Sequence, residues 1–197
     1  MSKSIEITFS KTARLPSSHG DFKMRVVKDE SGMEHVVIYK GDVMDADNLD
    51  VRVHSECMTS EVFHSLKCDC NEQLAWTLDR IEAQGIGMII YLRQEGRGIG
   101  LFNKICAYAL QDAGRNTIEA NTELGFESDL RTYEMAAEVL NAFRIKSINL
   151  ITNNPLKIGE LQKYGIEITR RIPIRIEPND HNRDYMKVKI DEMNHLP

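Results

Sequence analysis

Hydrophobic and polar residues alternate along the first fifty residues of the chain, which is the two-residue period of a β-strand. Turn-forming residues such as His19-Gly20-Asp21 and Ser31-Gly32 interrupt the alternation. Alternating runs that are separated by turn signals predict antiparallel strands. The three runs are IEITF (5–9), FKMRVV (22–27) and EHVVIYKGDV (34–43).

The same period continues through LDVRVHSEC (49–57) and predicts a further strand. Arg52, His54 and Glu56 fall on one face of this strand, and the valines between them fall on the other. One face is therefore suited to a core and the other to a polar site.

After residue 72 the period becomes helical, because Leu74, Leu78 and Ile81 recur at helical spacing and Gly85 follows as a C-terminal cap. Helices and strands then alternate to the end of the chain. The expected elements are a helix at 72–84, a buried strand at 86–92, a glycine-rich loop at 93–100, a helix at 101–113, a helix from Ser128 or Asp129 to Phe143, a strand at 147–152, a helix from Asn154-Pro155 to Gly165, a strand segment at 166–176 and a short helix at 183–194.

Antiparallel strands followed by alternating helices and strands predict an α/β fold with a mixed β-sheet flanked by helices. The chain has 197 residues and 42% hydrophobic residues, enough to bury a core. Its five prolines are scattered, and no linker-like stretch divides it. We therefore expect one domain over residues 1–197.

Charge and hydropathy narrow the possible partners and compartment. A formal net charge of -5 argues against bulk binding to nucleic acid, which favours a basic face. The start MSKSIEITFS has no apolar signal core, and the apolar run at 86–92 is too short to span a bilayer. We expect no membrane association and a reducing, cytoplasmic location, where disulfides are disfavoured.

Three cysteines lie close together in the sequence: Cys57, Cys68 and Cys70. Thiolates are preferred zinc ligands, and zinc takes four ligands in a tetrahedron. Three protein ligands leave a position for water or substrate, as in a catalytic site. A fourth protein ligand would instead close the site as a structural one, and spacing alone favours neither. The candidates for that ligand are His54, His64 and Cys106.

Two segments have the features of anion-binding sites. The loop RQEGRGIG joins a strand to a helix, and Glu95 and Arg97 flank its glycines. A tight connection without a ligand is the plainer interpretation. In TNNPLK, Thr152 ends a strand and Lys157 lies in the first turn of a helix, where a cation opposes the helix dipole. That placement indicates an anion between the lysine and the helix terminus.

Three further residues have both a structural and a chemical interpretation. Asp129 could cap a helix, and Arg131 could be a surface residue. Beside a metal motif they could instead be an acid/base group and a phosphate clamp. Tyr108 lies on the apolar stripe of its helix, so it is either a core tyrosine or a proton donor.

Eight ordered motifs together resemble the GTP cyclohydrolase II family, and the likeness covers nearly the whole chain. It is strongest from Arg52 to Lys157, and the tail after residue 177 follows the family pattern only loosely. The motifs are RVHSEC, CDC, QLAWTL, RQEGRGIGL, KICAYALQD, TIEAN, LGFESDLR and LITNNPLK.

The resemblance implies a homodimeric α/β enzyme at the first step of riboflavin biosynthesis. It would hydrolyse GTP to 2,5-diamino-6-hydroxy-4-(5-phosphoribosylamino)pyrimidine, formate and pyrophosphate. Zn²⁺, one per chain, would act at the purine, and Mg²⁺ would accompany the phosphates.

The resemblance also assigns roles to individual positions. It implies that Cys57, Cys68 and Cys70 bind zinc and that water holds the fourth site. It makes Asp129 a proton acceptor, Arg131 a nucleophile at the α-phosphate and Tyr108 a catalytic tyrosine. The implied GTP-binding residues are Arg52, Val53, His54, Ser55, Glu56, Gln73, Glu95, Gly96, Arg97, Thr117, Thr152 and Lys157.

Elementary chemistry qualifies two of these roles. Three thiolates neutralise zinc more than three imidazoles do, so water bound there needs a base nearby. A guanidinium stays protonated at neutral pH, which favours Arg131 as a group that stabilises charge at the α-phosphate rather than one that attacks it.

Two other functions are compatible with the sequence. A related enzyme could stop after ring opening and keep the formyl group. A non-catalytic, zinc-stabilised nucleotide-binding or interaction protein would have a closed metal site and replaceable acid/base residues. The joint presence of Asp129, Arg131 and Tyr108 favours an enzyme.

Overall fold

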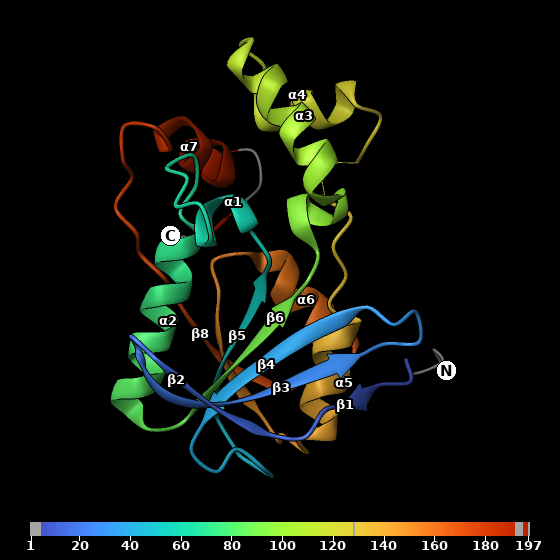
Figure 1. The fold of residues 1–197 in the computed structure, drawn as a ribbon, viewed down its shortest axis with the longest axis vertical. Coiled ribbons are helices and arrows are strands. Elements are labelled where there is room, and N and C mark those ends of the chain that lie inside the picture. Colours follow the sequence, from blue (N-terminus) through green and yellow to red (C-terminus); the bar gives the residue numbers. More distant parts are fainter. Residues whose placement is uncertain (1–4, 128, 192–194, 197) are drawn as a thin grey trace.

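The computed structural model describes residues 5–127, 129–191 and 195–196, apart from the side chains of Thr117, Ile118 and Asp184. Figure 1 shows a sheet with helices on both faces and a group of helices beyond one of its ends. This arrangement confirms the predicted α/β class with a mixed sheet. None of the helices in the described ranges is both long and apolar enough to cross a membrane.

Eight strands form one sheet in the order β1-β3-β4-β6-β5-β7-β8, and β2 pairs with β3 beside β1. The pairs from β1 to β6 are antiparallel, whereas β5 pairs in parallel with β6 and β7, and β7 pairs in parallel with β8. The strands are β1 (Thr8–Phe9), β2 (Ala13–Ser17), β3 (Gly20–Lys28), β4 (Glu34–Lys40), β5 (Leu49–Ser55), β6 (Gly87–Leu92), β7 (Ile148–Ile151) and β8 (Ile168–Ile172).

The helices fall into two groups: those that cover the sheet and those beyond its end (Figure 1). They are α1 (Met58–Glu61), α2 (Cys70–Gln84), α3 (Gly100–Asp112), α4 (Thr117–Glu123), α5 (Glu134–Ala142), α6 (Pro155–Lys163) and α7 (Arg183–Asp191), with a 3-10 turn at Glu95–Gly98.

The larger core lies between the sheet and helices α5 and α6. Val51 and Val53 of β5 are fully buried there with Leu140 of α5 and Leu161 of α6. Helix α2 covers the other face, where Ile81 packs with buried residues of β3 and β6. The alternation of β5 thus places its valines in the core, as predicted.

Parallel pairing sets the position of the polar groups. Strands β5, β6 and β7 run in the same direction, so the loops that follow them emerge at one end of the sheet. Figure 1 shows α1, α3 and α7 at that end. Ligand sites in α/β sheets form at the carboxyl ends of parallel strands.

The structure differs from the sequence predictions at several places. Strand β2 and helices α1 and α4 were not predicted. The helix predicted from Ser128 or Asp129 begins only at Glu134, because Asp129 binds the side chain and amide of Arg131 in a loop rather than capping a helix. The final helix is described to Asp191, and the remainder of its predicted range, 192–194, lies outside the described residues.

Candidate functional site

A cavity of about 1140 Å³, including its opening to solvent, lies beyond the carboxyl ends of β5, β6 and β7. Most of the residues singled out from the sequence line it, although they come from segments far apart in the chain. They are Arg52, His54, Ser55, Glu56, Cys57, Cys68, Cys70, Gln73, Glu95, Gly96, Arg97, Tyr108, Arg131 and Lys157.

Four predicted residues do not line the cavity with a described side chain. The side chain of Val53 is fully buried in the core, and its carbonyl oxygen accepts a hydrogen bond from Lys157 Nζ at 2.7 Å. Thr152 is buried and accepts from the amide of Asn154. Asp129 is not among the residues that line the cavity but forms an ion pair with Arg131, which is, and the side chain of Thr117 lies outside the described residues.

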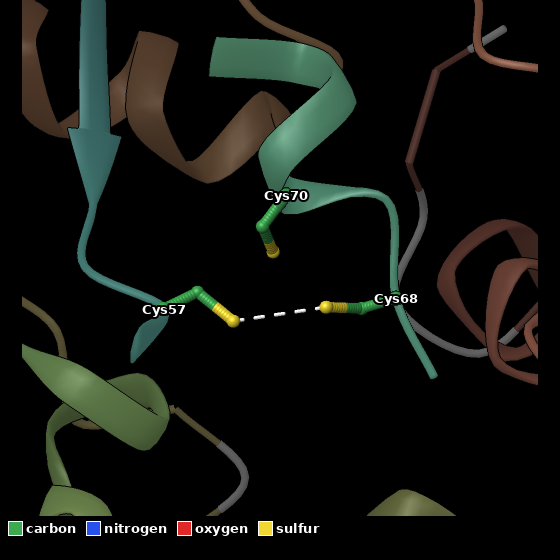
Figure 2. Close-up of side chains that lie close together, drawn as sticks. All are labelled: Cys57, Cys68 and Cys70. Carbon is green, nitrogen blue, oxygen red and sulfur yellow. Dashed lines mark hydrogen bonds between the residues drawn. The ribbon is translucent and has the colours of Figure 1, made fainter. Parts of the chain in front are cut away.

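The three clustered cysteines converge on one point (Figure 2). Cys57 follows β5, Cys68 precedes α2 and Cys70 is the first residue of α2. Their sulfur atoms all lie within 4.8 Å of one another, and Cys57 Sγ is 3.6 Å from Cys68 Sγ. Zinc–sulfur bonds of about 2.3 Å in a tetrahedron separate the sulfurs by about 3.8 Å. The group could therefore hold a metal ion.

The residues considered as a fourth protein ligand are not part of this group. Within the described residues, the metal-compatible group contains the three cysteines and not His54, His64 or Cys106. His54 instead contacts Glu61, with 2.7 Å between Nε2 and Oε1. Among the described residues, this group therefore offers three protein ligands to a metal ion.

A lysine compensates the negative charge of the cysteine group. Lys104 Nζ donates to Cys57 Sγ at 3.1 Å and to Glu95 Oε1 at 2.8 Å. Hydrogen bonds from the Cys68 and Cys70 thiols lower the pKa of Cys57, and Lys104 lowers it further. Glu95 in turn accepts from the amide of Met58, next to Cys57. The metal-compatible group and the glycine-rich loop are thus connected.

A buried chain of hydrogen bonds starts at Arg52, which donates from Nε to His54 Nδ1 at 3.3 Å. The proton of the neutral imidazole must then be on Nε2, where it is donated to Glu61. Burial lowers the pKa of His54 to about 4, although the bond to Glu61 opposes that shift. The same guanidinium of Arg52 also donates from Nη2 to Gln73 Oε1.

The glycine-rich loop holds Arg97, of which one guanidinium nitrogen has no hydrogen-bond partner among the described residues. Gly96 and Arg97 both adopt left-handed backbone conformations, with φ of 61° and 60°. Such a conformation is uncommon for residues other than glycine, and strained residues of this kind cluster at ligand sites. Among the described side-chain atoms, Arg97 Nη1 is buried and has no hydrogen-bond partner. A half-buried guanidinium with a buried, unpaired nitrogen can receive an anion.

Two more cations face the same region. The Asp129 carboxylate binds Arg131 through Nε at 2.8 Å and Nη2 at 2.5 Å. Burial opposes the charge on Arg131, but this pairing outweighs burial and raises its pKa. Lys157 is buried, and burial together with Arg52 and Arg131 holds its pKa well below the ordinary lysine value. The crowding of cations, only partly neutralised by carboxylates, favours an anionic ligand.

Tyr108 lies on the wall of the cavity rather than in the core. Its hydroxyl is 3.5 Å from Thr59 Oγ1, which is 3.7 Å from Cys57 Sγ. Burial raises the pKa of Tyr108 to about 12, so its hydroxyl keeps its proton at neutral pH. It is a donor that is linked to Cys57 through the hydroxyl of Thr59.

The sequence interpretation missed several residues of the cavity. Lys104 was assigned no role from the sequence, although its spacing from Gly100 places it on the first turns of α3. Tyr185, Lys189 and His195 come from the tail, where no motif was recognised. A lysine at 9% exposure is unusual, but burial cannot be recognised from one sequence.

The fold and the cavity define an α/β protein with a metal-compatible thiol cluster beside a cation-rich surface. The sequence matches the family model described as GTP cyclohydrolase II over residues 8–173. Because the match covers most of its length, the chain belongs to the GTP cyclohydrolase II family.

Relatives from several organisms agree with this assignment. The chain is 50% identical to the GTP cyclohydrolase-2 of Picrophilus torridus over 190 residues, which cover 96% of this chain and 99% of the relative. It is 51% identical to the GTP cyclohydrolase-2 of Campylobacter fetus, covering 98% and 97%. It is 47% identical to the riboflavin biosynthesis protein RibBA of Endomicrobium trichonymphae, covering 92% of this chain and 45% of that longer protein.

The buried neutral His54 predicts a pH-dependent stability. Its pKa is about 4 in the folded protein and about 6.5 when unfolded, so the unfolded state binds more protons between these values. The stabilisation is present above pH 6.5 and is lost as the pH falls toward 4. From this residue alone, we expect the free energy of unfolding to decrease by about 2 kcal/mol between pH 7 and pH 5.

Urea unfolding of the wild type and of His54→Gln at both pH values, each saturated with zinc, measures this contribution. Between pH 7 and pH 5, the free energy of unfolding of the variant should decrease by about 2 kcal/mol less than that of the wild type. His195 and the cysteines titrate in both proteins and cancel in the comparison. An equal pH dependence in the two proteins would show that His54 is not buried in its neutral form.

Proposed function

We propose that this protein hydrolyses GTP to 2,5-diamino-6-hydroxy-4-(5-phosphoribosylamino)pyrimidine, formate and pyrophosphate, in riboflavin biosynthesis. The observation that carries the proposal is that the cysteine group and the cationic residues line one cavity. A purine nucleoside triphosphate would use the cysteine group at its base, where the ring is opened. It would use the cationic residues at its phosphates, which carry negative charge. The GTP cyclohydrolase II family membership supports the choice of GTP.

Zn²⁺ is the metal that best fits the donor set of Cys57, Cys68 and Cys70, because thiolates and a sulfur spacing near 3.6 Å suit it. When bound, zinc would supply an activated water for attack at C8 of the guanine. Tyr108 is the nearby proton donor, and Glu95 with Lys104 maintains the charge around Cys57. These residues would orient the base and move protons during ring opening.

Recognition of guanine would rest on polar side chains beside the cysteine group. Arg52 and Gln73 are held together by a hydrogen bond, and Glu56 and Glu95 face the same cavity. Burial raises the pKa of Glu56, with Arg93 opposing the shift. A site that pairs buried polar groups with a substrate rejects an analogue that leaves them unpaired.

The phosphates would lie among Arg97, Arg131 and Lys157, with Mg²⁺ bound to the phosphate oxygens. Arg97 Nη1 has no hydrogen-bond partner among the described residues, and the pKa of Lys157 is depressed. Both observations favour binding of an anion at these residues. Bound phosphate would restore the charged form of Lys157, because an opposite charge favours ionisation.

Arg131 would stabilise charge at the α-phosphate rather than attack it. Deprotonating a guanidinium at neutral pH costs roughly 7 kcal/mol or more, at about 1.4 kcal/mol for each pH unit below its pKa. The bidentate pairing with Asp129 raises that pKa and therefore the cost. Asp129 would orient the guanidinium and could lower the cost of attack only by accepting its proton.

A purified preparation with GTP, Zn²⁺ and Mg²⁺ tests the function directly. We expect one zinc per chain and release of both formate and pyrophosphate, with ATP a poor substrate. Cys68→Ser should lose zinc and formate release, because two thiolates remain where three are needed. Product masses and metal analysis measure both effects. Cys106→Ser, a cysteine outside the group, is the matched control.

Three outcomes of that experiment would contradict parts of the proposal. A product that keeps the formyl group would indicate an enzyme that stops after ring opening. Nucleotide binding without any product would indicate a binding protein. Full activity of Cys68→Ser, or a pure protein without zinc, would remove the metal from the mechanism.

Arg131→Lys distinguishes the two roles of the arginine. Lysine keeps the charge but not the planar fork that Asp129 binds, so pyrophosphate release should be reduced but not abolished. If Arg131 were the nucleophile, that variant would be inactive in this step, and Cys68→Ser would accumulate a guanylyl adduct on Arg131. Intact-protein and peptide mass analysis would detect the adduct, and a stoichiometric yield would overturn charge stabilisation.

We also propose a homodimer in the cytoplasm. Large apolar side chains are exposed beside the site, with Phe63 at 71% and Phe102 at 80%, and a partner copy would cover them. Three reduced cysteines as metal ligands suit a reducing compartment. Sedimentation of the pure protein should give twice the chain mass, and Phe102→Ser should shift it toward the monomer. A wild-type monomer at micromolar concentration would contradict this arrangement.

A further inference from the structure

The C-terminal helix α7 contributes to the cavity although it lies beyond the part of the chain that matches the family model. That match ends at residue 173, and α7 spans Arg183–Asp191. Tyr185 and Lys189 of this helix line the cavity. Figure 1 shows α7 at the same end of the sheet as α1 and the start of α2. The tail is therefore part of the site.

Lys189 makes the closest contact between the tail and the rest of the site. Its ammonium group donates a hydrogen bond to Asp69 Oδ1, and the exposed fractions of the two residues are 9% and 1%. The ring of Tyr185 lies 4.6 Å from Lys189 Nζ. A buried ion pair constrains its neighbours, because neither charge can be left without a partner.

Asp69 contacts Gln73, which in turn contacts Arg52, and both of these residues are proposed to bind the guanine base. Its second oxygen, Oδ2, accepts a hydrogen bond from Gln73 Nε2. A carboxylate can only accept, so the amide nitrogen of Gln73 must face Asp69 and its oxygen must face Arg52. The orientation of the Gln73 amide, and with it one end of the Arg52 guanidinium, depends on Asp69.

We propose that Lys189 is a positioning residue for guanine recognition, acting through Asp69 on Gln73 and Arg52. The inference rests on the proposed function, because it concerns the same nucleotide site. The lysine neutralises Asp69 and fixes its rotamer. The carboxylate is then in place to hold the Gln73 amide in a single orientation toward the base.

The tail has anchors that do not use the side chain of Lys189. The amide of His195 donates to the carbonyl oxygen of Lys189 at 2.9 Å, and the amide of Leu196 donates to that of Asn153 at 2.8 Å. A substitution of the Lys189 side chain leaves these backbone bonds available. Its effect on the site can therefore be separated from loss of the tail.

Lys189→Met tests the proposal, with Lys187→Met as the matched control, because Lys187 is an exposed lysine on the same helix. We expect the KM for GTP to increase at least about tenfold and kcat to stay within about threefold, since lost positioning of the base weakens ground-state and transition-state binding alike. Zinc should remain at one per chain. Lys189→Arg, which keeps the charge, should restore KM to within about threefold of the wild type.

The double variant Asp69→Asn with Lys189→Met checks that the effect passes through Asp69. A neutral amide can still accept from Gln73 without needing a cation, so the double variant should bind GTP more tightly than Lys189→Met alone. This outcome also holds if burial of an unpaired Asp69 lowers the stability of the single variant.

Several results would overturn the inference. They are a KM of Lys189→Met equal to that of Lys187→Met, a loss of zinc that accounts for the lost activity, or a double variant no better than the single one. A wild-type protein that does not release formate from GTP would instead refute the proposed function. If wild type and control are active and Lys189→Met matches them, only the role of Lys189 fails.

Discussion

Parallel pairing of β5 with β6 and β7 is the constraint on which the site depends. It brings the carboxyl ends of three strands to one edge, and each of the following loops delivers one component of the cavity. Cys57 follows β5, the glycine-rich loop follows β6, and the turn that leads to Lys157 follows β7. The valines of β5 hold the strand in this position, because they are fully buried in the core with residues of α5 and α6. A shift of β5 by one residue would exchange Arg52 and His54 for valines at the site.

Charge compensation is the second constraint. Many ionisable groups lie around the cavity, and a buried charge is costly unless it has a partner. Lys104 lies between the Cys57 sulfur and Glu95, Asp129 holds Arg131, and Lys189 holds Asp69. Among the described residues of the cavity, Arg52 and Lys157 donate to neutral acceptors and not to a carboxylate, and Arg97 Nη1 has no hydrogen-bond partner. Removing one partner of a buried ion pair leaves an uncompensated charge, so the pairs stabilise the folded cavity, while the cations without a carboxylate partner favour binding of an anion.

The sequence predicted this site better than it predicted some of the local structure. Alternation identified β5 and its two faces, and the ordered motifs identified the cysteines and the cationic residues that converge on the cavity. A helix cap was one of two interpretations of Asp129, and the helix start predicted from it was wrong, because aspartate serves as a cap or as a partner of a cation and only the position of the Arg131 side chain distinguishes the two. Strand β2 has only five residues and contains a proline, so it lacks a strong strand pattern. Lys189 was missed because its partner, Asp69, is 120 residues away and no motif links them.

The stretch from Cys68 to Gln73 connects the two tasks that the proposed reaction requires. Cys68 and Cys70 are two of the three sulfur donors, while Asp69 between them orients Gln73 one turn along α2. A purine is rigid, so the distance from its C8 to the polar edge of its six-membered ring does not change. An enzyme that attacks C8 must therefore fix the metal relative to the groups that hold that edge, because misplacement by about 1 Å can cost about a hundredfold in rate. Cys70 and Gln73 lie at the start of α2 and Cys68 lies just before it, so the rigid helix start holds these metal donors and a base-binding residue at a fixed separation. The buried carboxylate of Asp69, which lies between these two cysteines in the sequence, is paired with Lys189 of the tail, and this pairing compensates its charge.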